Sequence, residues 1–92
     1  MYLVAYDLLS DESPEHYSRV IEAIGRCGVA AEVQRSVWLL SSDWAQDRVR
    51  NYVGEELYQR DRLLVAHISD ASCIALTPQA ERLIRSQGWE IS

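Results

Sequence analysis

The feature that most constrains the fold is a continuous apolar run at the N-terminus, where residues 2–6 read Tyr-Leu-Val-Ala-Tyr. Valine and tyrosine favour strands. Continuous rather than alternating apolarity is typical of a central strand, covered on one side and partly on the other. The run stops at a lone carboxylate, Asp7. We therefore expect an interior strand of a sheet, with Asp7 at its end.

The next element is predicted as a helix. Ser13 can cap its N-terminus, and Pro14 suits the first turn, where a missing N–H costs nothing. The apolar residues that follow share one helical face: Tyr17, Val20, Ile21, Ile24 and Cys27. Gly28 is expected to end the helix in the left-handed conformation. His16 is expected to be exposed on this helix.

The remaining elements are shorter. We expect strands at 31–34 and 36–41 with a turn near Arg35, a helix capped by Ser41 or Ser42 and ended near Gly54, a strand at 63–68, a short strand at 73–76, and a last helix from Thr77-Pro78 to near Gly88. Up to the strand at 63–68, the order is β-α-β-β-α-β.

This order predicts an α+β fold of the ferredoxin-like kind, a four-stranded antiparallel sheet with two helices on one face. The 92 residues are too few for two cores, so we expect one domain over residues 1–92. Its core spans about 1–69. Residues 70–92 form a strand and helix extension, a candidate dimerisation element that is free to add to a sheet edge or to pack across a partner. Dimerisation would bury further surface of so small a domain.

Composition limits the function classes. The net charge is −5 and all nine basic residues are arginine, which argues against a broad basic surface that wraps nucleic acid. A local anion site on arginine is still compatible with this balance. Cys27 and Cys73 have no metal-ligand spacing, so we expect reduced thiols in a cytoplasmic protein. No apolar run approaches the roughly 20 residues that span a bilayer, so no membrane association is expected.

Three segments carry a resemblance to a known family. Residues 2–8 (Tyr-Leu-Val-Ala-Tyr-Asp-Leu) resemble the opening strand of the second core CRISPR-associated protein, the small partner of the spacer integrase. Residues 33–38 (Val-Gln-Arg-Ser-Val-Trp) are similar to a further segment of that family, and residues 61–65 (Asp-Arg-Leu-Leu-Val) to its strand after the second helix. Small SinR-like proteins share the strand-Asp and Asp-Arg-Leu-Leu-Val pattern.

The resemblance implies a ferredoxin-like homodimer, joined by C-terminal strands, in which Asp7 faces its symmetry mate. In members reported as nucleases, that aspartate pair binds Mg²⁺ or Mn²⁺. In others, the dimer is a non-catalytic scaffold for DNA and integrase. Two departures stand out. The loop after Asp7, basic in the family, here carries Asp11, Glu12 and Glu15, and the family's long hairpin between the second and third strands is missing.

The candidate site residues follow from this comparison. Asp7 is the candidate catalytic and metal-binding residue; a strand-end Asp that accepts backbone N–H bonds in the next turn is the alternative. Arg35 with Ser36 is a candidate nucleic-acid or anion site, and an ion pair across the strand turn is the alternative.

Two functions are predicted from these residues. The first is a homodimeric, metal-dependent endonuclease that hydrolyses phosphodiester bonds of DNA or RNA. The second is a non-catalytic dimeric scaffold or adaptor of CRISPR adaptation, of a toxin–antitoxin system or of a mobile element.

Overall fold

The computed structural model describes residues 1–89, which form a sheet and three helices. The elements are β1 (Tyr2–Asp7), α1 (Pro14–Cys27), β2 (Val29–Gln34), β3 (Val37–Ser41), α2 (Gln46–Gly54), β4 (Arg62–His67) and α3 (Pro78–Ser86). The strand order is β2-β3-β1-β4, and every neighbouring pair is antiparallel. This is the ferredoxin-like βαββαβ arrangement, so the predicted fold class is confirmed.

The apolar first strand is an interior strand, because β1 lies between β3 and β4. Tyr2, Val4 and Tyr6 are buried beneath the helices. Leu3 and Ala5 alternate with them on the opposite face and are only half-buried. The prediction of a strand covered fully on one side and partly on the other is therefore confirmed, and it brings Asp7 to an exposed end of the sheet.

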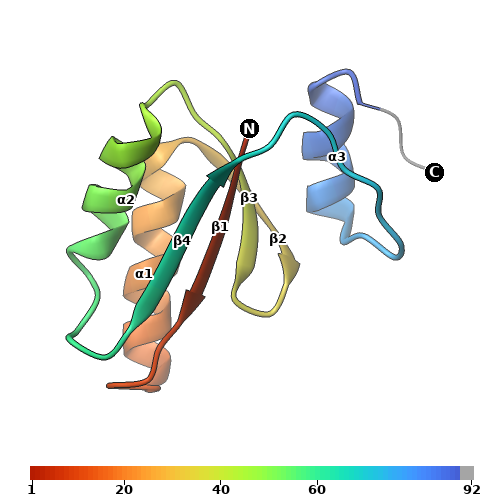
Figure 1. Ribbon diagram of the computed structural model, residues 1–92. Coiled ribbons are helices and arrows are strands. Elements are labelled where there is room, and N and C mark those ends of the chain that lie inside the picture. Colours follow the sequence, from red (N-terminus) through yellow and green to blue (C-terminus); the bar gives the residue numbers. More distant parts are fainter. Residues whose placement is uncertain (90–92) are drawn as a thin grey trace.

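The helices form two layers on opposite faces of the sheet (Figure 1). Helices α1 and α2 cover one face, with Val20, Ile24 and Val49 in the core beneath them. Helix α3 lies on the other face, where Leu83 and Ile84 pack with Leu39 of β3 and with Ala31 of β2. Because α3 covers β2 and β3, no helix of the described residues lies on the other half of this face, over β1 and β4. None of the helices within residues 1–89 is long and apolar enough to cross a membrane.

Local capping explains where α1 and α3 begin. The Ser13 hydroxyl accepts the N–H of His16 (3.2 Å), and the Thr77 hydroxyl accepts the N–H of Ala80 (3.2 Å). Proline follows each cap in the first turn. Both predicted helix starts are confirmed.

The second helix starts later than predicted. The Ser42 hydroxyl donates to the carbonyl of Cys27 (2.6 Å) and accepts the N–H of Trp44 (3.0 Å), so it holds the turn after β3 instead of capping a helix. Helix α2 begins at Gln46, and its cap, Ala45, has no side-chain hydrogen bond. The Gln46 side chain reaches β4, an outer strand, where Nε2 donates to the carbonyl of Val65 (2.7 Å).

The predicted strand at 73–76 is wrong. Ala75 has a φ of 59°, a left-handed conformation that interrupts an extended chain, and Ile74 is 96% exposed. Cys73 and Leu76 pack against the core under α3. The described part of the extension therefore folds back on its own sheet. Residues 90–92 of the predicted 70–92 extension lie outside the described residues.

Gly28 ends α1 without the predicted left-handed conformation. Its φ is 165°, extended backbone that any residue adopts. The reason for glycine is space, because a Cβ at this position would overlap the carbonyl oxygen of Ser41 in the neighbouring strand β3.

We therefore expect Gly28→Ala to lower the free energy of unfolding by about 1–3 kcal/mol through overpacking. Gly25→Ala is the matched control: no atom lies within 4 Å of its added Cβ, and alanine in a helix should stabilise by roughly 0.5–1 kcal/mol. Urea unfolding of the two variants measures the difference. Equal effects of the same sign would contradict the steric explanation.

Candidate functional site

Asp7 ends β1 as an exposed carboxylate. Within residues 1–89, this carboxylate takes part in no hydrogen bond or ion pair. The alternative interpretation, a strand-end aspartate that accepts backbone N–H groups of the next turn, is therefore wrong. The N–H groups of the following turn donate to Asp61 instead. The Oδ1 atom of Asp61 accepts the N–H groups of Leu9 (2.8 Å) and Ser10 (2.9 Å).

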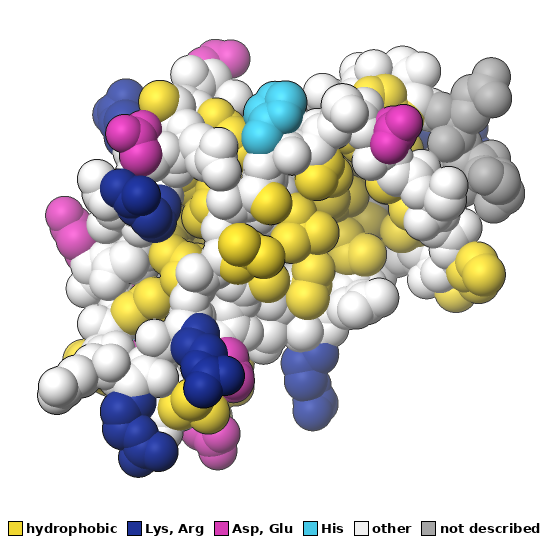
Figure 2. All heavy atoms as spheres, viewed as in Figure 1, with side chains coloured by type: hydrophobic (Ala, Val, Ile, Leu, Met, Phe, Trp, Pro, Cys, Tyr) yellow, Lys and Arg dark blue, Asp and Glu magenta, His cyan; other side chains and the backbone are white. Residues whose placement is uncertain are grey.

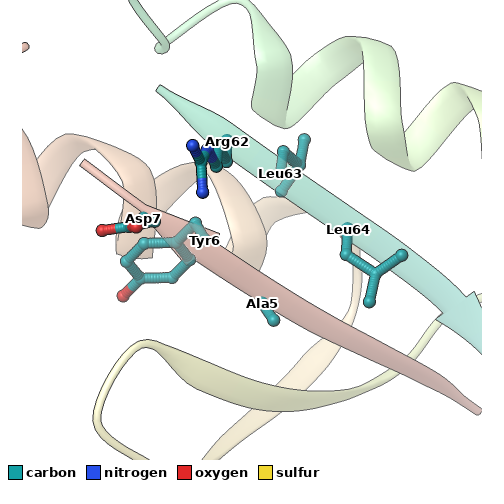
Figure 3. A pocket seen from close by; sticks show the side chains of 6 residues that line it. All are labelled: Ala5, Tyr6, Asp7, Arg62, Leu63 and Leu64. Atoms are coloured by element: carbon teal, nitrogen blue, oxygen red, sulfur yellow. The ribbon is translucent and has the colours of Figure 1, made fainter. Parts of the chain in front are cut away.

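Arg62 is the cross-strand neighbour of Asp7. The two residues are opposite each other in the β1–β4 register, and both are exposed. Among the described residues, no ion pair within 4.0 Å joins them. Figure 3 shows both side chains at the same end of the two strands, on a surface pocket of about 260 Å³ that Ala5 and Leu64 also line. The rim of the sheet thus presents one carboxylate and one guanidinium side by side.

An apolar surface adjoins this rim, and we call it the open face. It consists of side chains on the side of the sheet opposite α1 and α2: Leu3, Ala5, Val37, Leu64 and Ala66. Leu64 is 57% exposed. Figure 2 shows hydrophobic side chains gathered at the centre of this side of the molecule, with charged residues around them. An exposed apolar patch with a polar rim is typical of an interaction surface.

Arg35 and Ser36 occupy the β2–β3 turn, as predicted. The Ser36 carbonyl accepts the N–H of Tyr6 (3.1 Å), which ties this turn to the strand that carries Asp7. The side chains of Arg35 and Ser36 line a pocket with Tyr17 and Ile21 of α1, a different pocket from that of Asp7. Among the described residues, Arg35 forms no ion pair within 4.0 Å across the turn. Because Asp7 and the Arg35–Ser36 turn line different pockets, the structure does not bring the two predicted sites together.

A divalent metal ion fits Asp7 only in part within one copy. Mg²⁺ and Mn²⁺ prefer oxygen ligands, and Mg²⁺ is often held through one or two carboxylates plus water. The unpartnered Asp7 carboxylate supplies such a ligand. No group of three or more His, Cys, Asp or Glu side chains within residues 1–89 could hold a metal ion. A second carboxylate would have to come from another copy of the chain.

His16 is buried, which corrects the prediction that it is exposed. It has no solvent-accessible surface, and the ring of Tyr58 lies over it at 4.6 Å. Nδ1 lies 2.7 Å from the carbonyl oxygen of Asp11, and Nε2 lies 2.7 Å from that of Glu56. A carbonyl oxygen can only accept, so both contacts are hydrogen bonds only when the imidazole is doubly protonated and charged.

Asp61 balances this charge. Its side chain is fully buried, and its Oδ2 lies 3.9 Å from His16 Nε2. Burial alone would raise the pKa of Asp61, but the N–H groups of Tyr58, Ser10 and Leu9 and the charge of His16 lower it below its usual value. Burial alone would lower the pKa of His16, but the two carbonyl acceptors and Asp61 raise it. The pair is a buried ion pair that joins the loop after β1 to the segment before β4.

One sequence signal could have shown that His16 is buried. His16 precedes Val20, Ile24 and Cys27 at spacings of four, four and three, which places it on the buried face of α1. Asp61 and Arg62 both belong to the Asp-Arg-Leu-Leu-Val segment, but the sequence pattern alone assigned no function to either residue.

The acidic loop has a local function too, because Asp11 Oδ1 accepts the N–H of Ser13 (2.9 Å), and this bond lowers the pKa of Asp11.

Comparisons with known proteins found no match to the chain among protein-family models, curated proteins or solved structures.

Proposed function

We propose that the chain works as a homodimer in which the open faces of two copies meet and the two Asp7 carboxylates lie at the interface. The observation that carries this proposal is the position of Asp7: it is exposed, it has no partner among residues 1–89, and it stands at the rim of an apolar surface. This side chain forms no hydrogen bond or ion pair within the described part of one copy. It is available for a contact with a second molecule.

A second copy fits this surface for two reasons. The rim carries opposite charges, Asp7 and Arg62, and a two-fold-related copy presents the same pair, so the surface can be complementary to itself. A domain of this size also gains stability from further apolar burial. Helix α3 covers most of the β2–β3 half of the face, so the contact would centre on β1 and β4 and would reach Val37 at the start of β3.

The function proposed for this dimer is that of a metal-dependent endonuclease, as in the nuclease members of the second core CRISPR-associated family that the sequence resembles. Asp7 of each copy would hold Mg²⁺ or Mn²⁺. When bound, the ion would polarise the phosphodiester and neutralise the charge that develops on it during hydrolysis. Arg62, beside Asp7, would orient the phosphate through its planar fork of donors. The two free cysteines among the described residues fit a cytoplasmic protein.

The test is a cleavage assay on DNA and RNA with Mg²⁺ or Mn²⁺, with and without a chelator. Asp7→Ala should reduce cleavage by about 100-fold, since even the outer partners of metal ligands contribute 10- to 100-fold. Asp70→Ala, an exposed loop aspartate, is the matched control and should cleave normally. Intact nucleic acid with the unaltered protein, or equal cleavage by Asp7→Ala, would overturn the catalytic proposal.

A non-catalytic dimeric scaffold is the second candidate, and Arg62 favours it. Across the interface, Arg62 of each copy could neutralise Asp7 of the other and leave no ligand for a metal ion. The acidic residues after Asp7 and the net charge of −5 also disfavour a phosphate backbone at this rim. In this form, the dimer would act as an adaptor for an integrase or another partner of a CRISPR, toxin–antitoxin or mobile-element system.

A charge exchange separates the two candidates. In the scaffold, Asp7→Arg and Arg62→Asp should each weaken the dimer, and the double variant should restore it. In the endonuclease, the double variant should remain inactive whether or not it dimerises. Analytical ultracentrifugation and the cleavage assay are the two measurements.

A further inference from the structure

Two loops meet at the end of the sheet that carries Asp7, and the His16 side chain contacts both of them. The first is the β1–α1 loop, residues 8–13, and the second is the α2–β4 segment, residues 55–61. His16, in the first turn of α1, donates to the Asp11 carbonyl in the first loop and to the Glu56 carbonyl in the second, at 2.7 Å each. Three further contacts cross between the loops, from the N–H groups of Leu9 and Ser10 to Asp61 and from that of Arg60 to the Ser10 hydroxyl (3.1 Å).

The two hydrogen bonds of His16 depend on the protonation state of its imidazole. Neutral imidazole has one N–H and one lone pair, so it can satisfy only one of the two carbonyls. The other carbonyl would then face a lone pair in a site without solvent, and the buried Asp61 would lose its counter-charge. Loss of the proton therefore weakens a hydrogen bond and an ion pair together.

We propose that His16 is a pH-sensitive latch, which holds the β1–α1 loop against the α2–β4 segment while both ring nitrogens are protonated and weakens this attachment when one proton leaves. The loop begins directly after Asp7, so a weaker attachment would loosen the chain at the rim of the open face. This inference does not depend on the proposed function.

The charged and titratable groups around the ring support a protonated resting state. From the β1–α1 loop, the nearest is Asp11, whose carboxylate is engaged by Ser13. From the α2–β4 segment come Asp61, Glu56 and Tyr58. From α1 comes Arg19, which lies 3.8 Å from the Glu56 carboxylate and donates to the Tyr58 hydroxyl (3.0 Å). Because the Arg19 guanidinium offsets the charge of the Glu56 carboxylate, the carboxylates of Asp61 and Asp11 leave a net negative charge around the ring.

The direction of the pH effect follows from the pKa shifts of His16 and Asp61. The pKa of His16 is raised above 6.5, so its contribution is fully present below that pH and is lost as the pH rises through the folded value. The pKa of Asp61 is lowered below 3.8, so its contribution is present above that pH and is lost as the pH falls through the folded value. The latch is therefore closed in mildly acidic solution and opens toward alkaline pH.

Amide hydrogen exchange tests the latch over a pH series that starts at about pH 6 and rises through the folded pKa of His16. Protection factors of Leu9, Ser10 and Tyr58 should fall by up to about tenfold per pH unit between 6.5 and the folded pKa of His16, then level off. Amides at the centre of β1 should not show this fall. His16→Gln, which has no titrating group, should show lower protection that does not vary with pH.

His67→Gln is the matched control, because His67 is exposed on β4 and lies outside the latch; it should behave like the unaltered protein. Nitrogen NMR of the His16 ring should show two protonated nitrogens at about pH 6, below the raised pKa. Either an unprotonated ring nitrogen at that pH or pH-independent loop protection in the unaltered protein would overturn the proposal.

Discussion

Asp61→Ala is expected to lower the free energy of unfolding by about 3–5 kcal/mol, the usual cost of removing one partner of a buried ion pair. The substitution leaves a buried His16 without its counter-charge and leaves three backbone N–H groups, those of Leu9, Ser10 and Tyr58, without an acceptor. This is a large share of the roughly 5–15 kcal/mol that stabilises a typical domain.

Urea unfolding at mildly acidic pH measures the loss. Asp61→Asn provides a milder variant, since it keeps one oxygen acceptor but removes the charge, and it should fall between Asp61→Ala and the unaltered protein. The control is Asp70→Ala, an exposed position that should change stability by less than about 0.5 kcal/mol. A loss of less than about 1 kcal/mol for Asp61→Ala would show that the pair is not a major source of stability.

Leu64→Asp is expected to convert the proposed dimer into a monomer. Leu64 is the most exposed large hydrophobic residue of the open face, at 57%. Because the proposed interface is two-fold symmetric, one substitution would bury two unpaired carboxylates, and we expect the dissociation constant to rise by about 1,000-fold or more.

Analytical ultracentrifugation over a concentration series measures this change, and circular dichroism checks that the fold is kept. Val29→Asp is the matched control, because Val29 is 66% exposed but lies on the outer strand β2, away from the open face. If the unaltered protein is a monomer throughout the series, or if Val29→Asp dissociates the dimer as strongly as Leu64→Asp, the proposed interface is wrong.

The elements that could be predicted from the sequence are those whose cause is local. Ser13-Pro14 and Thr77-Pro78 each contain a cap and a first-turn proline within two residues, so both helix starts could be placed. The interior position of β1 could be predicted because its apolarity is continuous. The later start of α2 could not, because the Ser42 hydroxyl is occupied by the carbonyl of Cys27, 15 residues earlier in the chain.

The buried pair was missed for the same reason. The partners of His16 are backbone carbonyls, which no residue type reveals, and one of them lies 40 residues away. The position of α3 also depends on distant contacts, since Ala80, Leu83 and Ile84 pack on residues of β2 and β3. For the candidate site, the sequence identified Asp7 and the Arg35–Ser36 turn, but not that they line separate pockets. Arg35 and Ser36 share their pocket with Tyr17 and Ile21 of α1, contacts between distant segments that no local pattern reveals.

The hydrogen bond from Gln46 to Val65 bears on how copies of this chain can assemble. An unprotected outer strand lets molecules add to one another without limit, and such growth ends in fibres. With the Val65 carbonyl already engaged, a foreign strand cannot build a continuous ladder along β4. At this edge strand addition is hindered, whereas the proposed two-fold contact through the open face would use up its own surface and stop at two.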